Sequence, residues 1–148
     1  MTSSPTYLVT GVNSGLGKYL YSHIPGSLGL TRENSSEIFE QCHQIENLVI
    51  LHCAYNSKRD ILDYSDYLND NVFLTWELLK LPSARFVYFS SVDLYGALTP
   101  YSFLKRASGD LVAKLASNYL ILYLPAILGP HMRKNSLLRV LEEASGLT

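Results

Sequence analysis

The 148-residue sequence has only two cysteines, no apolar run of membrane-spanning length and no excess of basic residues. Two cysteines in apolar settings do not make a disulfide framework, so Cys42 and Cys53 are interpreted as reduced core thiols of a cytoplasmic protein. A membrane-spanning helix needs about 20 consecutive apolar residues, and none is therefore predicted. The 12 Lys and Arg residues nearly balance the 13 Asp and Glu residues, for a net charge of −1, which argues against an extended nucleic-acid surface.

Histidines are few and scattered, and the N-terminus carries no charged segment. No carboxylate or cysteine lies at ligand spacing from any of them, so no metal site is predicted from His23, His43, His52 or His131. The uncharged first five residues lead directly into a short apolar run, so no signal peptide is expected. Because domains usually have about 150 residues, residues 1–148 are predicted to form a single domain.

Short apolar runs alternate with helical patterns along the whole chain. The runs are almost continuously apolar, as in strands covered on both faces, and predict strands at 7–10, 28–31, 48–53, 85–90 and 119–124. Apolar residues at helical spacing predict helices near 16–24 and 38–45 and over 60–81, 101–117 and 136–144. This alternation predicts an α/β fold with a doubly wound, Rossmann-like parallel sheet.

A glycine-rich segment lies where the first strand is expected to turn into the first helix. Glycines there let the backbone turn tightly and approach a pyrophosphate, and the helix N-terminus supplies free N–H donors. The sequence therefore predicts a dinucleotide site formed by Gly11, Asn13, Ser14, Gly15, Leu16 and Gly17. A plain strand-to-helix turn is the alternative. A P-loop is excluded because five residues separate Gly11 from Gly17 and because Tyr19 follows Lys18.

The second predicted strand is followed by Arg32. An acidic residue at this place accepts hydrogen bonds from the adenosine ribose, whereas an arginine suits a 2′-phosphate. Arg32 therefore tilts the predicted cofactor slightly from NAD toward NADP. An ordinary solvated arginine is an equally good interpretation.

The fourth predicted strand leads into Ser91, and Tyr101 and Lys105 follow one helical turn apart. Thr99 is a good N-cap and Pro100 a good first helical residue, so this helix is predicted to begin at Pro100. An ammonium beside a phenol, with the nicotinamide charge nearby, would lower the tyrosine pKa from its usual value of about 10. Such a tyrosine can exchange a proton with a carbonyl or alcohol while the nicotinamide moves a hydride.

These motifs, in this order, resemble the short-chain dehydrogenase/reductase superfamily. Other segments resemble its extended branch, the NAD-dependent epimerase/dehydratase family: the strand 86–92 with Tyr95-Gly96, the strand 49–54, Asn71-Val72 with Thr75, and 124–125 with Gly129-Pro130. In that family the catalytic Ser or Thr lies four residues before the Tyr of Tyr-Gly, which selects Ser91 over Ser90.

The resemblance implies an NAD(P)-dependent oxidoreductase or epimerase acting on a carbonyl or nucleotide-sugar substrate. Ser91 would orient the substrate oxygen, Tyr101 would be the acid/base, and Lys105 would hold the nicotinamide ribose. The cofactor would also run along Cys53, Ala54 and Pro125. A homodimer formed by the helices 60–81 and 101–117 is implied as well. The alternatives are a non-catalytic NAD(P)-binding module, as a sensor or a subunit of a larger assembly, and a vestigial cofactor site.

Several features depart from the family pattern. Ser14 occupies the middle glycine site, and Leu124 stands where an arginine is common. Between Arg32 and Leu48 there is room for one helix only, so the family's third strand, which normally supplies an aspartate near the adenine, is predicted to be deleted. Five strands in the order 2-1-3-4-5 would remain. The family's C-terminal substrate lobe is expected to be missing.

Overall fold

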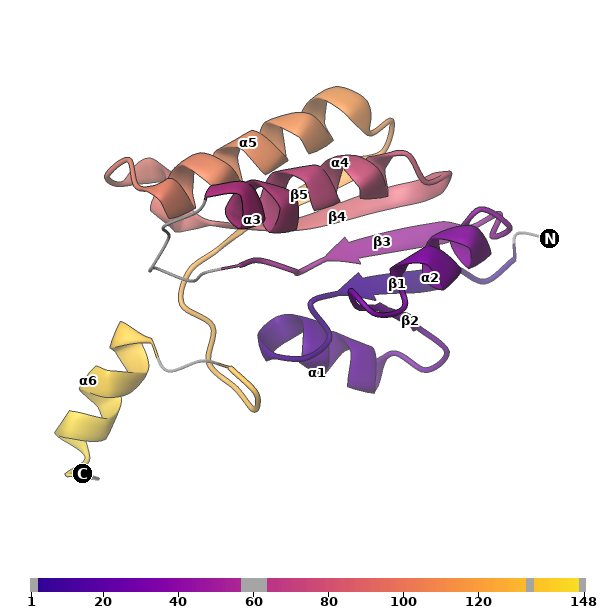
Figure 1. Cartoon of the computed structure of the whole chain (residues 1–148). Coiled ribbons are helices and arrows are strands. Elements are labelled where there is room, and N and C mark those ends of the chain that lie inside the picture. The colour runs from indigo at the N-terminus through magenta and orange to yellow at the C-terminus, as the bar shows by residue number, and fades with distance from the viewer. Residues whose placement is uncertain (1–2, 57–63, 133–134, 147–148) are drawn as a thin grey trace.

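The computed structural model describes residues 3–56, 64–132 and 135–146 (Figure 1). Five strands and the helices between them follow the predicted alternation. In chain order the elements are β1 Thr6–Thr10, α1 Gly15–His23, β2 Leu28–Leu30, α2 Ser35–Cys42, β3 Leu48–His52, α3 Tyr64–Leu68, the π turn η1 Asn69–Phe73, α4 Leu74–Leu79, β4 Ser83–Ser91, the 3₁₀ turn η2 Val92–Tyr95, α5 Pro100–Leu115, β5 Tyr119–Leu124 and α6 Ser136–Ala144.

The strands form one parallel sheet in the order β2-β1-β3-β4-β5. The register pairs Val9 of β1 with Leu51 of β3, and Leu51 with Val87 of β4. Both the α/β class and the strand order predicted from the sequence are therefore confirmed. The short strand β2 lies at one edge of the sheet. Because the strands are parallel, the carboxyl ends of β1, β2 and β3 lie at the same end of the sheet.

The two faces of the sheet are covered unequally (Figure 1). Helices α2, α4 and α5 cover one face, over a core that includes Leu8, Ile50 and Phe86. Only α1 packs on the other face, where the core is smaller and centres on Val9, Leu51 and Val87. The prediction that every strand is covered on both faces is wrong for β5, an edge strand without a buried residue, because no helix of the described residues covers its second face.

The helix predicted over 60–81 is divided into α3, η1 and α4, with a π turn in the middle. Its first four predicted residues, 60–63, lie outside the described residues. Helix α5 begins at Pro100 as predicted, because the Thr99 hydroxyl accepts from the Ser102 N–H and Ser102 Oγ accepts from the Thr99 N–H. It ends at Leu115, two residues before the predicted end, since Ala116 is extended.

Helix α6 begins where the Asn135 side chain accepts a hydrogen bond from the Leu138 N–H. It lies apart from the sheet, at the end of the connection that leaves β5 (Figure 1). Leu137, Val140 and Leu141 are exposed on it. None of the helices in the described ranges is both long and apolar enough to cross a membrane.

Candidate functional site

A cavity of about 940 Å³ lies at the carboxyl ends of β1, β2 and β3. It is bordered by the glycine turn, by the segments after β2 and β3, by the helical segment 69–77 and by Tyr101. The predicted site residues among its lining are Gly11, Asn13, Ser14, Gly15, Leu16, Gly17, Arg32, Cys53, Ala54 and Tyr101. Ser91, Lys105 and Pro125 do not line it. Ser91 and Lys105 are buried and Pro125 is exposed.

The glycine turn connects β1 to α1 as the sequence predicts. Gly11 has a φ of 73°, in the region that favours glycine. A Cβ on Gly17 would lie 2.4 Å from the Gly11 carbonyl oxygen, so only glycine lets the helix approach the turn this closely. The first turn of α1 contains no acidic residue, and the Ser14 side chain does not cap it. The positive end of the helix dipole therefore faces the cavity without a counter-charge of its own.

One backbone N–H group of the glycine turn already donates a hydrogen bond within the protein. The Gly15 N–H donates to the His131 carbonyl oxygen at 2.9 Å. His131 belongs to the connection between β5 and α6 and has a φ of 71°, which is uncommon for a residue other than glycine. A segment more than one hundred residues further along the chain thus reaches the glycine turn.

A chain of hydrogen bonds fixes the strand ends beneath the cavity. His52 Nδ1 lies 2.8 Å from Thr10 Oγ1, and His52 Nε2 lies 2.8 Å from Thr75 Oγ1. Because the Thr75 hydroxyl donates to the Asn71 carbonyl oxygen, it can only accept from His52, so the ring proton is on Nε2. Nδ1 then accepts from the Thr10 hydroxyl.

The Thr10 hydroxyl also links β1 to the segment after β3. Its oxygen accepts from the N–H groups of Cys53 and Ala54, at 3.1 and 2.9 Å. Burial, followed by the charge of Lys105, lowers the pKa of His52 to about 3, so the ring is neutral at physiological pH. His52 is therefore a structural residue that holds the two strand ends against each other.

Ser91, Tyr101 and Lys105 come together from the end of β4 and the first two turns of α5. A hydrogen bond between Tyr101 and Ser91 lowers the pKa of the phenol, but burial raises it more, so the net shift is upward. The expected lowering of the Tyr101 pKa by Lys105 is not found. Lys105 Nζ donates to the Phe89 carbonyl oxygen at 2.8 Å, and burial lowers the pKa of Lys105 to about 8.

Tyr55 is a site residue that the sequence analysis missed. Its ring lies edge-on to the ring of Tyr101, with 4.7 Å between centroids, and Lys105 Nζ lies 4.8 Å from the Tyr55 centroid. Burial is the main cause that raises the pKa of Tyr55. The signal that could have found it is its place directly after Cys53-Ala54, where a central strand of a parallel sheet ends.

Asp70 is the second residue that was missed. Its Oδ2 lies 2.5 Å from Nη2 of Arg32 and accepts from Nδ2 of Asn56 at 2.8 Å. The residue comes from the π turn η1, so it reaches the cavity from the helix side, opposite the end of β2. The helical pattern of 60–81 predicts an outward-facing Asp70 and gives no sign that it meets the end of β2.

Neither cysteine has the character of a nucleophile. Burial raises the pKa of the Cys53 thiol to about 12 and also raises that of Cys42. Both are free thiols, and Cys42 lies in the core as predicted, whereas Cys53 lines the cavity. Within 3–56, 64–132 and 135–146, no group of three His, Cys, Asp or Glu residues could hold a metal ion.

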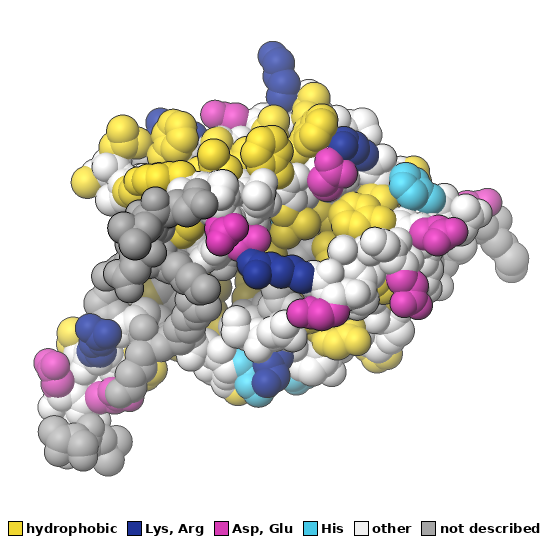
Figure 2. Space-filling model, viewed as in Figure 1, with side chains coloured by type: hydrophobic (Ala, Val, Ile, Leu, Met, Phe, Trp, Pro, Cys, Tyr) yellow, Lys and Arg dark blue, Asp and Glu magenta, His cyan; other side chains and the backbone are white. Residues whose placement is uncertain are grey.

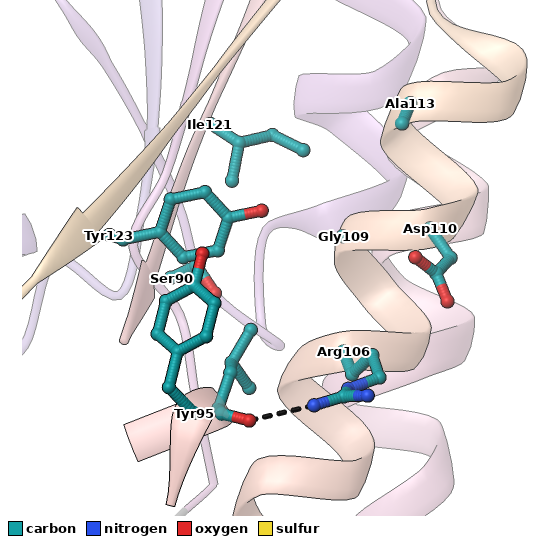
Figure 3. A pocket seen from close by; sticks show the side chains of 9 residues that line it. Ser90, Tyr95, Arg106, Gly109, Asp110, Ala113, Ile121 and Tyr123 are labelled. Atoms are coloured by element: carbon teal, nitrogen blue, oxygen red, sulfur yellow. Dashed lines mark hydrogen bonds between the residues drawn. The ribbon is translucent and has the colours of Figure 1, made fainter. Parts of the chain in front are cut away.

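A second cavity, of about 410 Å³, lies between α5 and the carboxyl ends of β4 and β5 (Figure 3). Tyr95 and Tyr123 border it on one side and Arg106 and Asp110 on the other. Arg106 is anchored there, because its Nη2 donates to the Leu94 carbonyl oxygen at 2.7 Å. None of the predicted site residues lines this cavity.

No family model and no curated protein matches the sequence. Solved structures do match. dTDP-4-dehydrorhamnose reductase from Bacillus anthracis, in complex with NADP, has a TM-score of 0.76 and 18% identity over 100% of this chain and 62% of its own. The Bordetella bronchiseptica enzyme WbmG, in complex with NAD and UDP, has a TM-score of 0.74 and 16% identity over 97% of this chain and 61% of its own. The fold is Rossmann-like.

UDP-glucuronic acid 4-epimerase from Bacillus cereus, in complex with NAD, also matches, with a TM-score of 0.69 and 16% identity over 86% of this chain. The structural neighbours are thus NAD(P)-dependent enzymes of the epimerase/dehydratase kind that the sequence motifs resemble. The likeness concerns the fold, since identities of 16 to 18% are low. This chain spans 59 to 62% of the length of these three proteins.

Proposed function

We propose that the chain binds NAD or NADP and uses Ser91, Tyr101 and Lys105 to transfer a proton to or from a carbonyl or alcohol. The observation that carries the proposal is that Tyr101 lines the same cavity as the glycine turn, with Ser91 as a neighbour that lowers the pKa of its phenol. A nucleotide sugar is the substrate class supported by the neighbours, which include structures with UDP-glucuronic acid and UDP-glucose. Membership of the extended short-chain dehydrogenase/reductase branch is part of the proposal.

The residues present fit a dinucleotide. The turn 11–17 suits a pyrophosphate for two reasons. No side chain at Gly17 fills the space beside the turn, and the first turn of α1 has no acidic residue to repel the phosphates. Cys53 and Ala54 would lie along the cofactor, Lys105 at the nicotinamide ribose, and Pro125 near the nicotinamide. Arg32 lies in the cavity, and alone it would favour NADP. When bound, the nicotinamide supplies or accepts the hydride.

The chain's own residues would handle the proton. Ser91 is a hydrogen-bonding neighbour that lowers the pKa of Tyr101, so both hydroxyls would be able to meet one substrate oxygen. The pKa of Tyr101 is raised, so its phenol carries a proton that it can donate, and a cation beside it would have to lower that pKa toward the range that favours proton transfer. Lys105 is buried on the helical turn that follows Tyr101, so its ammonium would stabilise the phenolate once the proton has left.

Replacing Tyr101 by phenylalanine tests this function. Tyr101→Phe should retain NADH and NADPH binding but lose hydride transfer to a panel of UDP- and dTDP-sugars by at least about a hundredfold, because only the proton-transfer group is removed. Tyr119→Phe, an exposed change on β5, is the control and should behave like the wild type. Unchanged turnover in Tyr101→Phe would rule out the assigned role.

A non-catalytic NAD(P)-binding module, acting as a sensor or as a subunit of a larger assembly, is the second candidate. It is favoured by the positions of Ser91 and Lys105, which do not line the cavity bordered by the glycine turn. Cofactor binding without turnover of any sugar nucleotide would support it. The two free thiols suit a reducing, cytoplasmic location.

A homodimer is a further part of the proposal. Exposed apolar side chains gather over α3, α4 and α5 (Figure 2), among them Leu68, Trp76 and Phe103. These residues suit the two-helix interface that the resemblance implies. Trp76→Glu should shift a dimer to monomer in sedimentation equilibrium, whereas Leu120→Glu, on the exposed edge strand β5, should not.

A further inference from the structure

An ion pair crosses the candidate dinucleotide cavity between two distant parts of the chain. Arg32 follows β2, the strand end at which a dinucleotide's adenosine ribose is read in such folds. Asp70 comes from the π turn η1, and its Oδ2 lies 2.5 Å from Nη2 of Arg32. Both residues line the cavity. The arginine that suits a 2′-phosphate therefore already has an anionic partner inside the site.

Asp70 is the fixed member of this pair. Its carboxylate accepts from the Asn56 side chain at 2.8 Å. The next residue of the π turn, Asn71, accepts from the Asn56 N–H at 2.7 Å and donates to the Asn56 carbonyl oxygen at 3.2 Å. The Asp70 side chain is 21% exposed and that of Arg32 is 79% exposed. The carboxylate is thus held against the segment after β3, and the arginine is free to adjust to it.

The charges decide which ribose suits the site. Arg32 and Asp70 together are neutral, so a 2′-phosphate approaching Arg32 meets a carboxylate at nearly the same distance. Both contacts of Asp70 go to Oδ2, and Oδ1 makes no hydrogen bond with the described residues. An unphosphorylated ribose can donate a hydroxyl proton to such an oxygen, whereas a phosphate has no proton to donate at neutral pH.

We propose that Asp70 is a specificity-determining residue of the cofactor site and turns the preference that Arg32 alone would give toward NAD. The inference rests on the proposed function, since it presumes that the cavity takes a nicotinamide dinucleotide. The π turn supports it, because such turns within helices are frequent at functional sites.

The test compares dissociation constants for NADH and NADPH, measured by nicotinamide fluorescence on the whole chain. The wild type should bind NADH at least as tightly as NADPH. Asp70→Asn keeps an acceptor for Asn56 but removes the charge, so it should lower the ratio Kd(NADPH)/Kd(NADH) by about fivefold or more. Arg32→Gln should raise that ratio. Asp66→Asn, an exposed change on α3 outside the cavity, is the matched control and should leave the ratio unchanged.

The outcomes separate the two proposals. A shifted ratio in Asp70→Asn with an unchanged ratio in Asp66→Asn supports the role of Asp70. If wild-type protein binds both dinucleotides and Asp70→Asn leaves the ratio within about twofold, this inference is wrong and the proposed function stands. If wild-type protein binds neither dinucleotide, the proposed function is wrong and the inference with it. Thermal unfolding of each variant checks that the fold is retained, and Arg32→Gln provides a second test should Asp70→Asn not fold.

Discussion

The ring of Tyr55 meets the ring of Tyr101 edge-on, with centroids 4.7 Å apart and planes at 73°. This is a favourable aromatic geometry, and it joins the segment after β3 to the first turn of α5. The same Tyr55 ring lies 4.8 Å from Lys105 Nζ, and the ring of Tyr88 lies 5.1 Å from it. The ammonium of Lys105 is therefore enclosed by two aromatic rings and a carbonyl, which accounts for its burial without a carboxylate partner among the described residues.

Removing the Tyr55 ring should expose Lys105 to water. Burial lowers the pKa of Lys105 from 10.5 to about 8, so Tyr55→Ala should raise that pKa toward its ordinary value. Tyr55→Phe keeps the ring and is the matched control, in which the pKa should stay near 8. Titration of the lysine Nζ and Cε signals by NMR measures both. An equal pKa in the two variants would show that Tyr55 does not shield the ammonium.

Lys105 should also make stability depend on alkaline pH. Its pKa is about 8 in the folded protein and 10.5 in the unfolded chain, so between these values the unfolded chain binds more protons. The free energy of unfolding should therefore rise from pH 8 to 10.5, by at most about 1.4 kcal/mol per pH unit from this group. Urea unfolding of the wild type and of Lys105→Met across this range measures the difference. A rise of the same size in Lys105→Met would contradict the prediction.

The hydrogen bonds of His52 predict a neutral ring with its proton on Nε2. Nitrogen NMR should find this tautomer well below pH 6.5, since burial lowers the pKa of His52 to about 3. The unfolded chain protonates below pH 6.5 and the folded protein does not, so this group makes the free energy of unfolding fall as pH decreases from 6.5 toward 3. Observation of a doubly protonated His52 ring in the folded protein at pH 5 would refute the assignment.

The hydroxyl of Thr75 joins His52 to the Asn71 carbonyl oxygen, so removing this hydroxyl tests what the hydrogen bonds contribute to stability. Thr75→Val leaves the buried Nε2–H of His52 and the Asn71 carbonyl without this partner, which should cost about 1–3 kcal/mol of unfolding free energy. Thr75→Ser retains the hydroxyl and should lose clearly less. Urea denaturation of the two variants gives the comparison, and equal losses would mean that the methyl group matters rather than the hydrogen bonds.

Gly17 should tolerate no side chain. A methyl group there would lie 2.4 Å from the Gly11 oxygen and 2.5 Å from the Thr10 oxygen, both of them backbone atoms. Gly17→Ala should therefore destabilise the protein by about 1–3 kcal/mol and weaken dinucleotide binding, because the turn must open. Gly109→Ala, on α5, meets no atom closer than 3.7 Å and should stabilise slightly. Thermal unfolding distinguishes the two, and similar midpoints would contradict the steric argument.

The sheet, the glycine turn and the start of α5 could be predicted because each depends on residues that are close in sequence. Apolar runs, glycines at a strand end and the pair Thr99-Pro100 carry their structural meaning locally. The strand order was predicted from the few residues between Arg32 and Leu48, which leave room for one helix and no further strand. All three agree with the structure.

Asp70 and Tyr55 could not be predicted in the same way. The contact of Asp70 with Arg32 joins residues 38 positions apart, and it depends on a π turn whose extra residue no periodic pattern announces. Tyr55 acquires its neighbours only when the segment after β3 meets α5. The exposure of β5 was missed for a related reason, since an apolar run does not reveal whether a helix covers its second face.

The hydrogen bond from the Gly15 N–H to the His131 carbonyl makes two events mutually exclusive. A phosphate that takes this donor must displace the His131 carbonyl. By linkage, whatever draws His131 away from the turn raises the affinity of the turn for such a ligand by the same factor by which the ligand frees His131. One backbone amide thus makes the residues around His131 competitors of an anion bound at this turn.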